Sequence, residues 1–311
     1  MLTIYRSDDV GAPVLNGYPG SLINVLDACL VNGYGDKPPV GWAKPFSDVN
    51  KAVYRPPAGN RFYLRVVDTA NYAAQVLGYR EMTSVDLGVE PFPAAAQLAN
   101  GLYLYRSNAY SLDARAWLLL ATDRVLLLWY GFAYPTHGGV GTSCDSFFFG
   151  DCPSFMPNDP SLTLIVGRHA SSSSASYTNF ANRMTAGGTS TGHYLANGFA
   201  QLGSAVPCGV LPCSPWNTST SGSNGPPFPD PITGGLLLDR MRIIEVSGYT
   251  NLIRGVIPGI FNVVHQYPGT HLTRFQGRGL YQGREFLMLQ TGGADGRYAV
   301  SLHEDDWLLM V

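Results

Sequence analysis

Residues 116–134, with the sequence AWLLLATDRVLLLWYGFAY, decide the fold class of this chain. Two apolar runs lie on either side of a short Ala-Thr-Asp-Arg segment. The stretch is long enough to span a membrane, but Asp123 and Arg124 lie near its centre, where each charge would cost about 2.5–3.5 kcal/mol. The pattern therefore predicts two buried β-strands joined by a tight turn, and no membrane insertion.

Short apolar runs of the same kind recur along the rest of the chain and favour an all-β organisation there. They are LYLYR at 102–106, SFFFG at 146–150, LTLIVG at 162–167, LLLDRMRIIEV at 236–246, EFLMLQ at 285–290 and YAVSLHE at 298–304. Near the N-terminus, Leu22, Leu26 and Cys29 recur at helical spacing between Ser21, a candidate N-cap, and Gly33, a candidate stop. We expect an α+β, predominantly β fold whose antiparallel sheets form a sandwich or barrel, with one short amphipathic helix near the N-terminus.

Composition shifts along the chain suggest how it is organised. Residues 1–95 hold the helix and a hairpin whose arms, AVYR and RFYLRVVD, flank the turn PPAGN. Residues 96–311 form a β-rich region, in which 170–231 are rich in Ser, Thr, Gly, Asn and Pro and are expected to be long loops. A single compact domain over the whole chain is the alternative.

The chain is poor in charge, which bears on its partners. Charged residues make up 14% of the 311 residues, against about 25% in an average soluble protein. Interface cores are depleted of charge and enriched in aromatic residues, so the composition favours a homo-oligomer in a symmetric assembly. The net charge of −2 and the scattered Lys and Arg residues argue against nucleic-acid binding. The first residues lack a basic segment followed by an apolar one, so we expect no secretory leader.

Five cysteines leave the thiol chemistry open. Cys29 lies on the apolar face of the expected helix and is predicted to be a small core residue. Cys144 with Cys152, and Cys208 with Cys213, are close enough in sequence to form local disulfides in an oxidising medium; reduced thiols are the default. Neither pair has the spacing or the histidine partners of a zinc site, so we expect no metal and no cofactor.

One pattern looks catalytic. Gly188-Thr-Ser-Thr-Gly192 matches the G-x-S-x-G form of a nucleophile elbow, with Ser190 at its centre and His193 just after it. Such an elbow needs a buried strand before the serine, and the residues before Gly188 are not apolar. We therefore expect no serine hydrolase and no enzyme. The acidic residues Asp8, Asp9 and 304–306 are expected to be solvated turn residues.

Several segments, taken in order, resemble a known family. They are LINVLDACLVNGYG (22–35), GWAKPFSDVNKAVYR (41–55), RFYLRVVD (61–68), GYREMTSVDLGVEPFP (78–93), RAWLLLATDRVLLLWY (115–130), FFFGDCPSFMPND (147–159) and IRGVIPGIFNVVHQYPG (253–269). Their order is similar to that in virion structural proteins encoded by tailed bacteriophages, usually of Gram-negative hosts. The resemblance implies a non-enzymatic virion component, made in the bacterial cytoplasm and present in many symmetric copies among other virion proteins. The tail, baseplate or tail tip is the leading placement; a capsid decoration or head-surface protein is the alternative.

A third hypothesis is a module that binds host-surface glycans as a receptor-binding protein. Trp216 and Asn217 lie in the polar loop CSPWNTS, and Tyr177 and Asn179 lie in the same loop-rich segment. Aromatic rings and amides of this kind are suited to sugar contacts. The other four tryptophans are predicted to be core residues.

Overall fold

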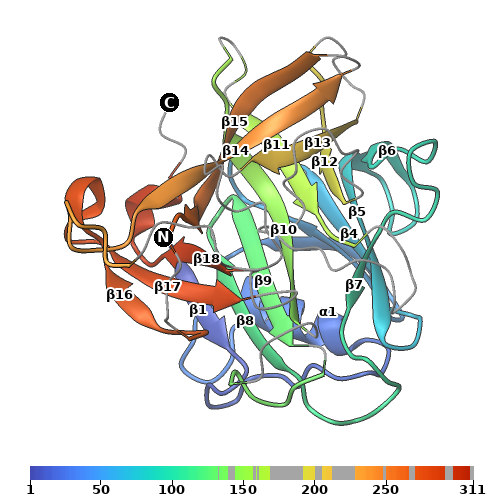
Figure 1. Ribbon diagram of the computed structural model, residues 1–311. Coiled ribbons are helices and arrows are strands. Elements are labelled where there is room, and N and C mark those ends of the chain that lie inside the picture. The colour runs from blue at the N-terminus through green and yellow to red at the C-terminus, as the bar shows by residue number, and fades with distance from the viewer. Residues whose placement is uncertain are drawn as a thin grey trace.

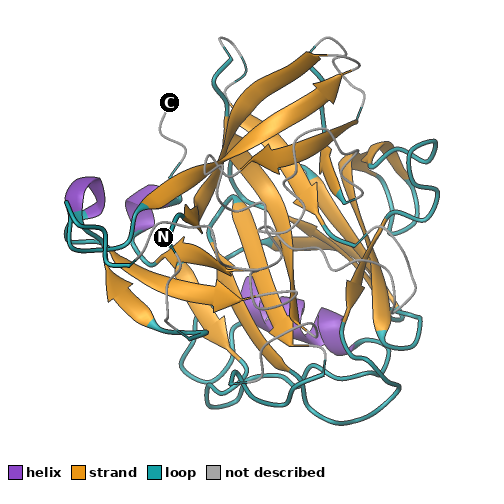
Figure 2. Cartoon of the chain, viewed as in Figure 1, coloured by secondary structure: helices purple, strands orange, loops and turns teal. Residues whose placement is uncertain are grey.

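The computed structural model describes residues 1–131, 133–138, 144–156, 159, 161–168, 192–199, 205–211, 228–247, 250–265, 270–290 and 297–308. Figures 1 and 2 show a molecule built mainly of strands. The helical elements are α1 (Ser21–Leu26), the π-helical turn η1 (Asp27–Asn32) and the 3-10 turns η2 (Gly279–Tyr281) and η3 (Glu304–Asp306).

Within the described residues, the larger sheet has twelve antiparallel strands. In spatial order they are β1 (Thr3–Arg6), β8 (Ala116–Ala121), β9 (Val125–Gly131), β10 (Cys144–Pro153), β11 (Ser161–Val166), β12 (His193–Leu195), β13 (Val206–Leu211), β14 (Leu238–Ser247), β15 (Thr250–Val263), β18 (Arg297–Ser301), β17 (Glu285–Gln290) and β16 (Arg274–Gln276). The predicted pair of buried strands is confirmed as β8 and β9, joined by a tight turn at Asp123 and Arg124.

The second sheet lies in the N-terminal part of the chain. Its strands are β2 (Ala43–Asp48), β3 (Lys51–Arg55), β4 (Tyr63–Val67), β5 (Ala73–Met82) and β6 (Gly88–Phe92), and β7 (Leu102–Tyr105) also pairs with β5. The predicted hairpin around PPAGN is confirmed as β3 and β4. Together the two sheets confirm the predominantly β fold with antiparallel sheets and one short helix.

Strands β8, β9 and β10 are buried on both faces, which explains their unbroken apolar sequence. Trp117 and Leu119 face one hydrophobic cluster, the first core, which they share with α1 and the second sheet. Leu118 and Leu120 face another cluster, the second core, which contains strands β10 to β15 and β17 to β18. Because alternate residues of a strand point to opposite faces, a strand between two cores must be apolar at every position.

The larger sheet curls until its later strands meet its centre. Ser154, just after β10, forms a β-bridge with Gly255 of β15, and the Phe155 N–H donates to the carbonyl of Arg254 at 2.8 Å. This contact closes the six strands β10 to β15 into a ring (Figure 1). Alternate residues of these strands fill the ring with the second core.

The N-terminal helix is held by a residue far along the chain. Ser21 is its first residue and makes no cap, so the expected N-cap role is wrong. Instead the carboxylate of Asp68, at the end of β4, accepts the Leu22 N–H at 3.0 Å. The expected stop is confirmed at Gly33, where φ is 79° and the N–H donates to the carbonyl of Ala28.

Strand pairing crosses residue 95, the predicted boundary between two regions. β1 pairs with β8, and β7 pairs with β5. The first core draws on residues from both sides of the boundary. The division at residue 95 and the alternative of one compact domain both stay predictions.

One predicted disulfide is wrong. Cys144 and Cys152 lie at the two ends of β10, eight residues apart, and an extended strand separates them by about 26 Å. A disulfide needs Cα atoms closer than about 7 Å. Cys29 is confirmed as a core residue, and Cys208 is buried in the second core. Cys213 lies outside the described residues, so its pairing with Cys208 stays a prediction.

Candidate functional site

All four residues predicted to contact a ligand lie outside the described part of the chain. These are Tyr177, Asn179, Trp216 and Asn217, together with Ser190 of the elbow-like pentapeptide. The four remaining tryptophans are confirmed as core residues, since all are 2% exposed or less. The candidate sites among the described residues are polar clusters and exposed apolar side chains.

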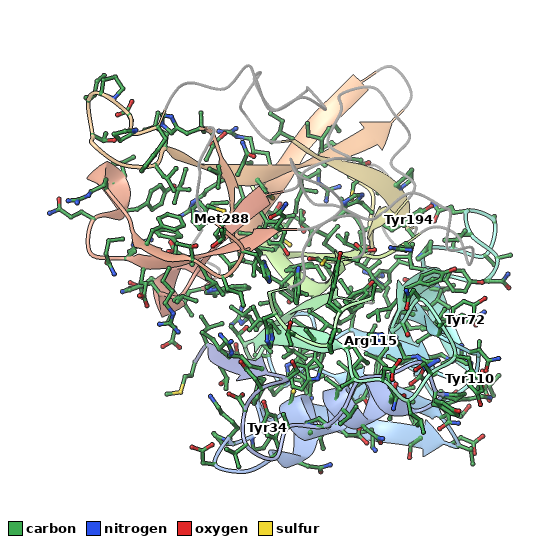
Figure 3. All side chains as sticks on the ribbon, turned by 60° about the horizontal axis from the view of Figure 1, so that its bottom comes forward. Tyr34, Tyr72, Tyr110, Arg115, Tyr194 and Met288 are labelled. Atoms are coloured by element: carbon green, nitrogen blue, oxygen red, sulfur yellow. The ribbon has the colours of Figure 1, made fainter. Side chains whose placement is uncertain are left out.

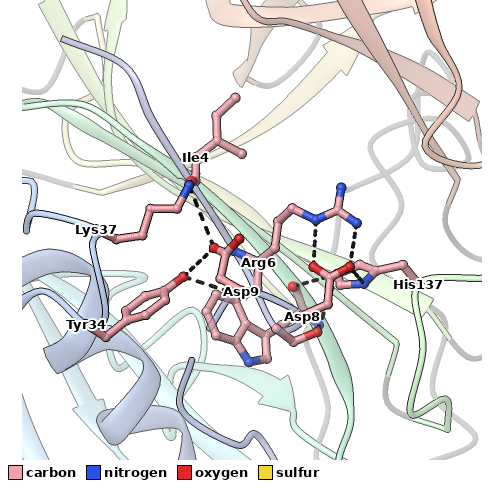
Figure 4. A network of polar contacts seen from close by, with 9 residues as sticks. Ile4, Arg6, Asp8, Asp9, Tyr34, Lys37 and His137 are labelled. Atoms are coloured by element: carbon pink, nitrogen blue, oxygen red, sulfur yellow. Dashed lines mark hydrogen bonds and ion pairs between the residues drawn. The ribbon is translucent and has the colours of Figure 1, made fainter. Parts of the chain in front are cut away.

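A polar network surrounds the N-terminal strand β1 (Figure 4). Arg6 makes two hydrogen bonds to the carboxylate of Asp8, at 2.7 and 2.8 Å. The carboxylate of Asp9 accepts the hydroxyl of Tyr34 at 2.8 Å and lies 3.9 Å from the ammonium of Lys37. This network fastens β1 to the turn that follows the N-terminal helix.

Ser7, His137 and Asp8 in this network have the residue types of a catalytic triad (Figure 4). His137 Nε2 lies 3.5 Å from Ser7 Oγ, and His137 Nδ1 lies 3.7 Å from Asp8 Oδ2. However, Nε2 also lies 2.9 Å from the carbonyl oxygen of Trp117, so it must carry a hydrogen and donate it there. A nitrogen in that state cannot take the serine proton, as a general base must.

The serine of this trio is also occupied by hydrogen bonds to the backbone. Ser7 Oγ accepts the backbone N–H of Trp117 at 3.2 Å, and the Ser7 N–H donates to the carbonyl of Trp117 at 2.9 Å. Both contacts tie the end of β1 to β8. The trio therefore holds the end of β1 against β8, and its geometry does not support nucleophilic catalysis.

Two acidic residues expected to be solvated are in fact buried or enclosed. Asp9 has a side chain only 18% exposed, because Tyr34 and Lys37 cover it. Asp306 is 5% exposed, pairs with Arg284 and accepts the hydroxyl of Ser301 at 2.5 Å. The expectation of solvated turns fails at both positions because each carboxylate has a partner distant in sequence.

A second ion network lies where the ring of strands closes. Arg254 of β15 is 3% exposed, and its guanidinium pairs with the carboxylate of Glu245 on β14 and with Asp159 at 2.9 Å. It also donates to the carbonyl of Asn197 at 3.4 Å. A single buried cation thus ties together residues 153–156, Asp159, and the segments 197–199 and 253–255.

These tied segments carry exposed apolar side chains. Phe155, Phe199 and Ile253 are 57%, 51% and 49% exposed. The N–H of Phe199 donates to Glu245 at 2.9 Å, and its ring lies 5.9 Å from the Arg254 guanidinium. We call Phe155, Phe199 and Ile253 the phenylalanine surface. The Arg254 network brings the three segments that carry them together, and exposed apolar side chains that gather in one place are candidates for a protein contact site.

The described residues also bear on metal binding and membrane insertion. Among the described residues, no group of three or more His, Cys, Asp or Glu side chains is arranged to hold a metal ion. No helix formed by those residues is long and apolar enough to cross a membrane.

No protein-family model matches the chain, and no significant match is found among curated proteins.

Sequence reasoning missed the arginines that organise the surfaces. Arg254 stands alone in the apolar run IRGVIPGIF, and Arg106 ends the run LYLYR. A lone charge inside an apolar strand is a usable signal, because a buried charge needs a partner. The signal does not identify that partner, which here is 9 residues away for Arg254 and 38 for Arg106.

Proposed function

We propose that this chain is a non-enzymatic structural component of a tailed-phage virion that assembles with other virion proteins through charge-poor surfaces. The phenylalanine surface is the observation that carries the proposal. Its three apolar side chains are about half exposed, and Arg254 holds the segments that bear them in fixed positions. Ordered apolar side chains of this kind lose water when a partner covers them.

Two further observations support the same proposal. The order of sequence segments resembles that of tailed-phage virion proteins. In addition, the Ser7, His137 and Asp8 trio, which could have suggested an enzyme, is occupied by structural hydrogen bonds. The tail, baseplate or tail tip is the proposed position, and the capsid surface is the alternative.

Imaging of particles tests the position. An antibody against the chain is applied to purified virions, and the label is located by electron microscopy. Label at the tail end, in the small symmetric copy number of a ring, supports the proposal. Label spread over the head in icosahedral numbers indicates decoration of the capsid. A chain absent from washed virions would overturn the virion assignment.

The contact surface is tested separately with purified protein. Phe155→Ser and Phe199→Ser should weaken self-association or co-assembly with other tail proteins, measured by light scattering and pull-down. Leu280→Ser is the matched control, because Leu280 is 95% exposed and belongs to the 3-10 turn η2 instead. Equal assembly by all three variants would remove the phenylalanine surface from the proposal.

A further inference from the structure

Three loops that are distant in sequence meet on another part of the surface. The N–H of Gly17 donates to the carbonyl of Ser111 at 2.8 Å, and the N–H of Tyr72 donates to the carbonyl of Gly17 at 3.0 Å. Residues 16–20, 69–72 and 107–114 therefore lie side by side. Figure 3 shows Tyr72 and Tyr110 on the same side of the molecule.

Aromatic side chains face outward from these loops. Tyr72 and Tyr110 are 37% and 52% exposed, and Leu112 beside them in sequence is 70% exposed. The ring of Tyr18 lies 4.1 Å from the ring of Tyr110, centroid to centroid. We call Tyr18, Tyr72, Tyr110 and Leu112 the tyrosine surface.

The rest of the three loops is small and polar but nearly uncharged. Asn, Ser, Thr, Gly, Ala and Pro make up almost all the other positions, and Asp113 is the single charged residue in 16–20, 69–72 and 107–114. Loops rich in Tyr, Ser, Gly and Asn are the usual composition of binding loops in antibodies, because they combine rigid rings with adaptable hydrogen-bonding groups.

A buried arginine fixes the loops from below. Arg106 is fully buried, pairs with Asp68 at 2.8 Å, and donates to the backbone carbonyls of Tyr18 and Ala70. Its own N–H donates to the carbonyl of Tyr72 at 2.9 Å. Arg106 therefore holds the loops 16–20 and 69–72 against the start of the loop 107–114.

Tyr72 is further supported by a stack of side chains that reaches the interior. Its ring stacks on Tyr105 with centroids 6.0 Å apart, and the guanidinium of Arg168 lies 4.7 Å from the centroid of Tyr105. Arg168 is paired with Asp145 at 2.5 Å, and both are buried. The exposed ring therefore has a fixed position before any ligand arrives.

The backbone is strained to present this ring. Tyr72 has φ of 50°, a left-handed conformation that is rare for a bulky residue. Such strain persists only where surrounding contacts impose it, and it clusters at binding sites. The loops are also packed too closely for a larger residue at Gly17, where a Cβ would lie 2.1 Å from the carbonyl oxygen of Ala109.

We propose that the tyrosine surface binds a neutral oligosaccharide. Aromatic faces pack on the apolar C–H faces of sugar rings, while tyrosine hydroxyls, amides and serine hydroxyls bond to sugar hydroxyls. The near absence of exposed charge disfavours anionic glycans and nucleic acids as ligands. This site uses residues different from the loop residues Tyr177, Asn179, Trp216 and Asn217, and it does not depend on the virion assignment.

The test uses the purified full chain and a panel of free oligosaccharides. Neutral glucose-, galactose- and N-acetylglucosamine-based oligomers are compared with sialylated oligomers and heparin fragments by saturation-transfer NMR and titration calorimetry. We expect binding of at least one neutral oligomer and none of the anionic ones. Tyr110→Ser and Tyr72→Asn should each weaken that binding by about tenfold or more.

The variants are chosen so that folding and binding are separable. Asn tolerates the left-handed conformation at position 72, and Tyr110 is half exposed, so both variants should keep the far-UV circular dichroism of the parent. Should Tyr72→Asn misfold, a Tyr110→Ser and Leu112→Ser double variant supplies the same test. Leu280→Ser and Phe199→Ser are controls that should bind as the parent does.

Three binding results would overturn the proposal, and a fourth result concerns self-association. They are no binding of any neutral oligomer at millimolar concentration, preferential binding of the anionic oligomers, or unchanged binding after loss of Tyr110. A concentration-dependent dimer that Tyr110→Ser abolishes, without any sugar binding, would also overturn it, by showing that a second copy of the chain occupies the surface.

Discussion

Arg106 and Arg254 perform the same task in two regions of the molecule. Each is buried, each pairs with carboxylate, and each donates to backbone carbonyls of segments distant in sequence. The surfaces above them differ: tyrosine, asparagine and serine above Arg106, phenylalanine and isoleucine around Arg254. In both regions the buried ion pair determines where a loop lies, while the residues carried by that loop determine what it can contact.

Removing either arginine should have the largest effect. Arg106→Met and Arg254→Met should each lower the free energy of unfolding by about 3–5 kcal/mol, because a buried carboxylate is left without its partner. The Arg254 variant should lose more stability than the Arg106 variant, because it leaves two carboxylates, Glu245 and Asp159, without their cationic partner. Urea denaturation followed by tryptophan fluorescence measures both.

An exposed ion pair provides the control for this experiment. Arg274 pairs with Glu285 at 3.1 Å, but its side chain is 61% exposed, so Arg274→Met should cost less than about 1 kcal/mol. If the Arg106 or Arg254 variants also lose less than about 1 kcal/mol of stability, the buried ion pairs do not hold the loops in place.

The contribution of Asp68, the partner of Arg106, to the free energy of unfolding should fall as pH rises. Burial raises the pKa of Asp68 to about 7, against the opposing effects of Arg106 and of backbone N–H groups. The unfolded carboxyl, with a pKa near 3.9, loses its proton first, so this group's contribution is complete below about pH 4 and is lost as pH rises to about 7. The slope should reach up to about 1.4 kcal/mol per pH unit.

The measurement is a difference between two proteins. Urea denaturation of the parent and of Asp68→Asn is repeated between pH 4 and pH 8. The variant should be less stable overall, because Arg106 keeps its charge, but the slope that Asp68 contributes should disappear. Parallel curves for the two proteins would contradict the raised pKa.

A histidine outside both arginine networks should give the opposite pH dependence. Burial lowers the pKa of His271 to about 3, with His137 and Arg6 adding to the effect. Its ring lies 4.3 Å from Trp129, and Nδ1 accepts the N–H of Gln290 at 3.2 Å. The unfolded imidazole, with a pKa near 6.5, binds a proton first, so stability should be lost as pH falls from about 6.5 towards 3.

His271→Asn isolates this contribution. The amide oxygen can still accept the Gln290 N–H, but it does not titrate in this range. The variant should therefore resist acidification better, relative to its own stability at pH 7, than the parent does. An identical acid transition in both proteins would show that His271 is not held neutral.

Thiol labelling gives the smallest expected effect, but it reports on the opening of the structure around each individual cysteine. Cys29 belongs to the first core, and Cys152 and Cys208 belong to the second. Burial raises the pKa of all three thiols, so iodoacetamide should not modify them in the folded protein. The experiment uses a Cys213→Ser background and mass spectrometry.

Low urea concentrations then show which region opens first. In Arg106→Met, Cys29 should react before Cys152; in Arg254→Met, the order should reverse. Simultaneous labelling of all three in both variants would indicate one cooperative unit, and would contradict a separate response of the two regions.

The sequence predicts features that depend on neighbouring residues. The hairpin of β8 and β9, the hairpin of β3 and β4, and the apolar face of α1 each follow from a local pattern, and each is confirmed. Cys29 and four tryptophans are core residues, as their apolar context indicates.

What the sequence does not reveal depends on distant partners. Asp68 lies 46 residues from the helix N-terminus that it supports, and Asp306 lies 22 residues from Arg284. Cys144 and Cys152 are near in sequence, which left a disulfide possible, but they lie at opposite ends of one strand and are far apart in space. The tyrosine surface needs three loops that no local pattern brings together.

The placement of β8 between two cores has a consequence for how this protein can change over generations. Trp117 and Leu119 pack in the first core, while Leu118 and Leu120 pack in the second core. A substitution that shifts this strand to suit one half disturbs the other. The tyrosine and phenylalanine loops can diversify freely at their tips, but the two halves that carry them are bound to evolve together.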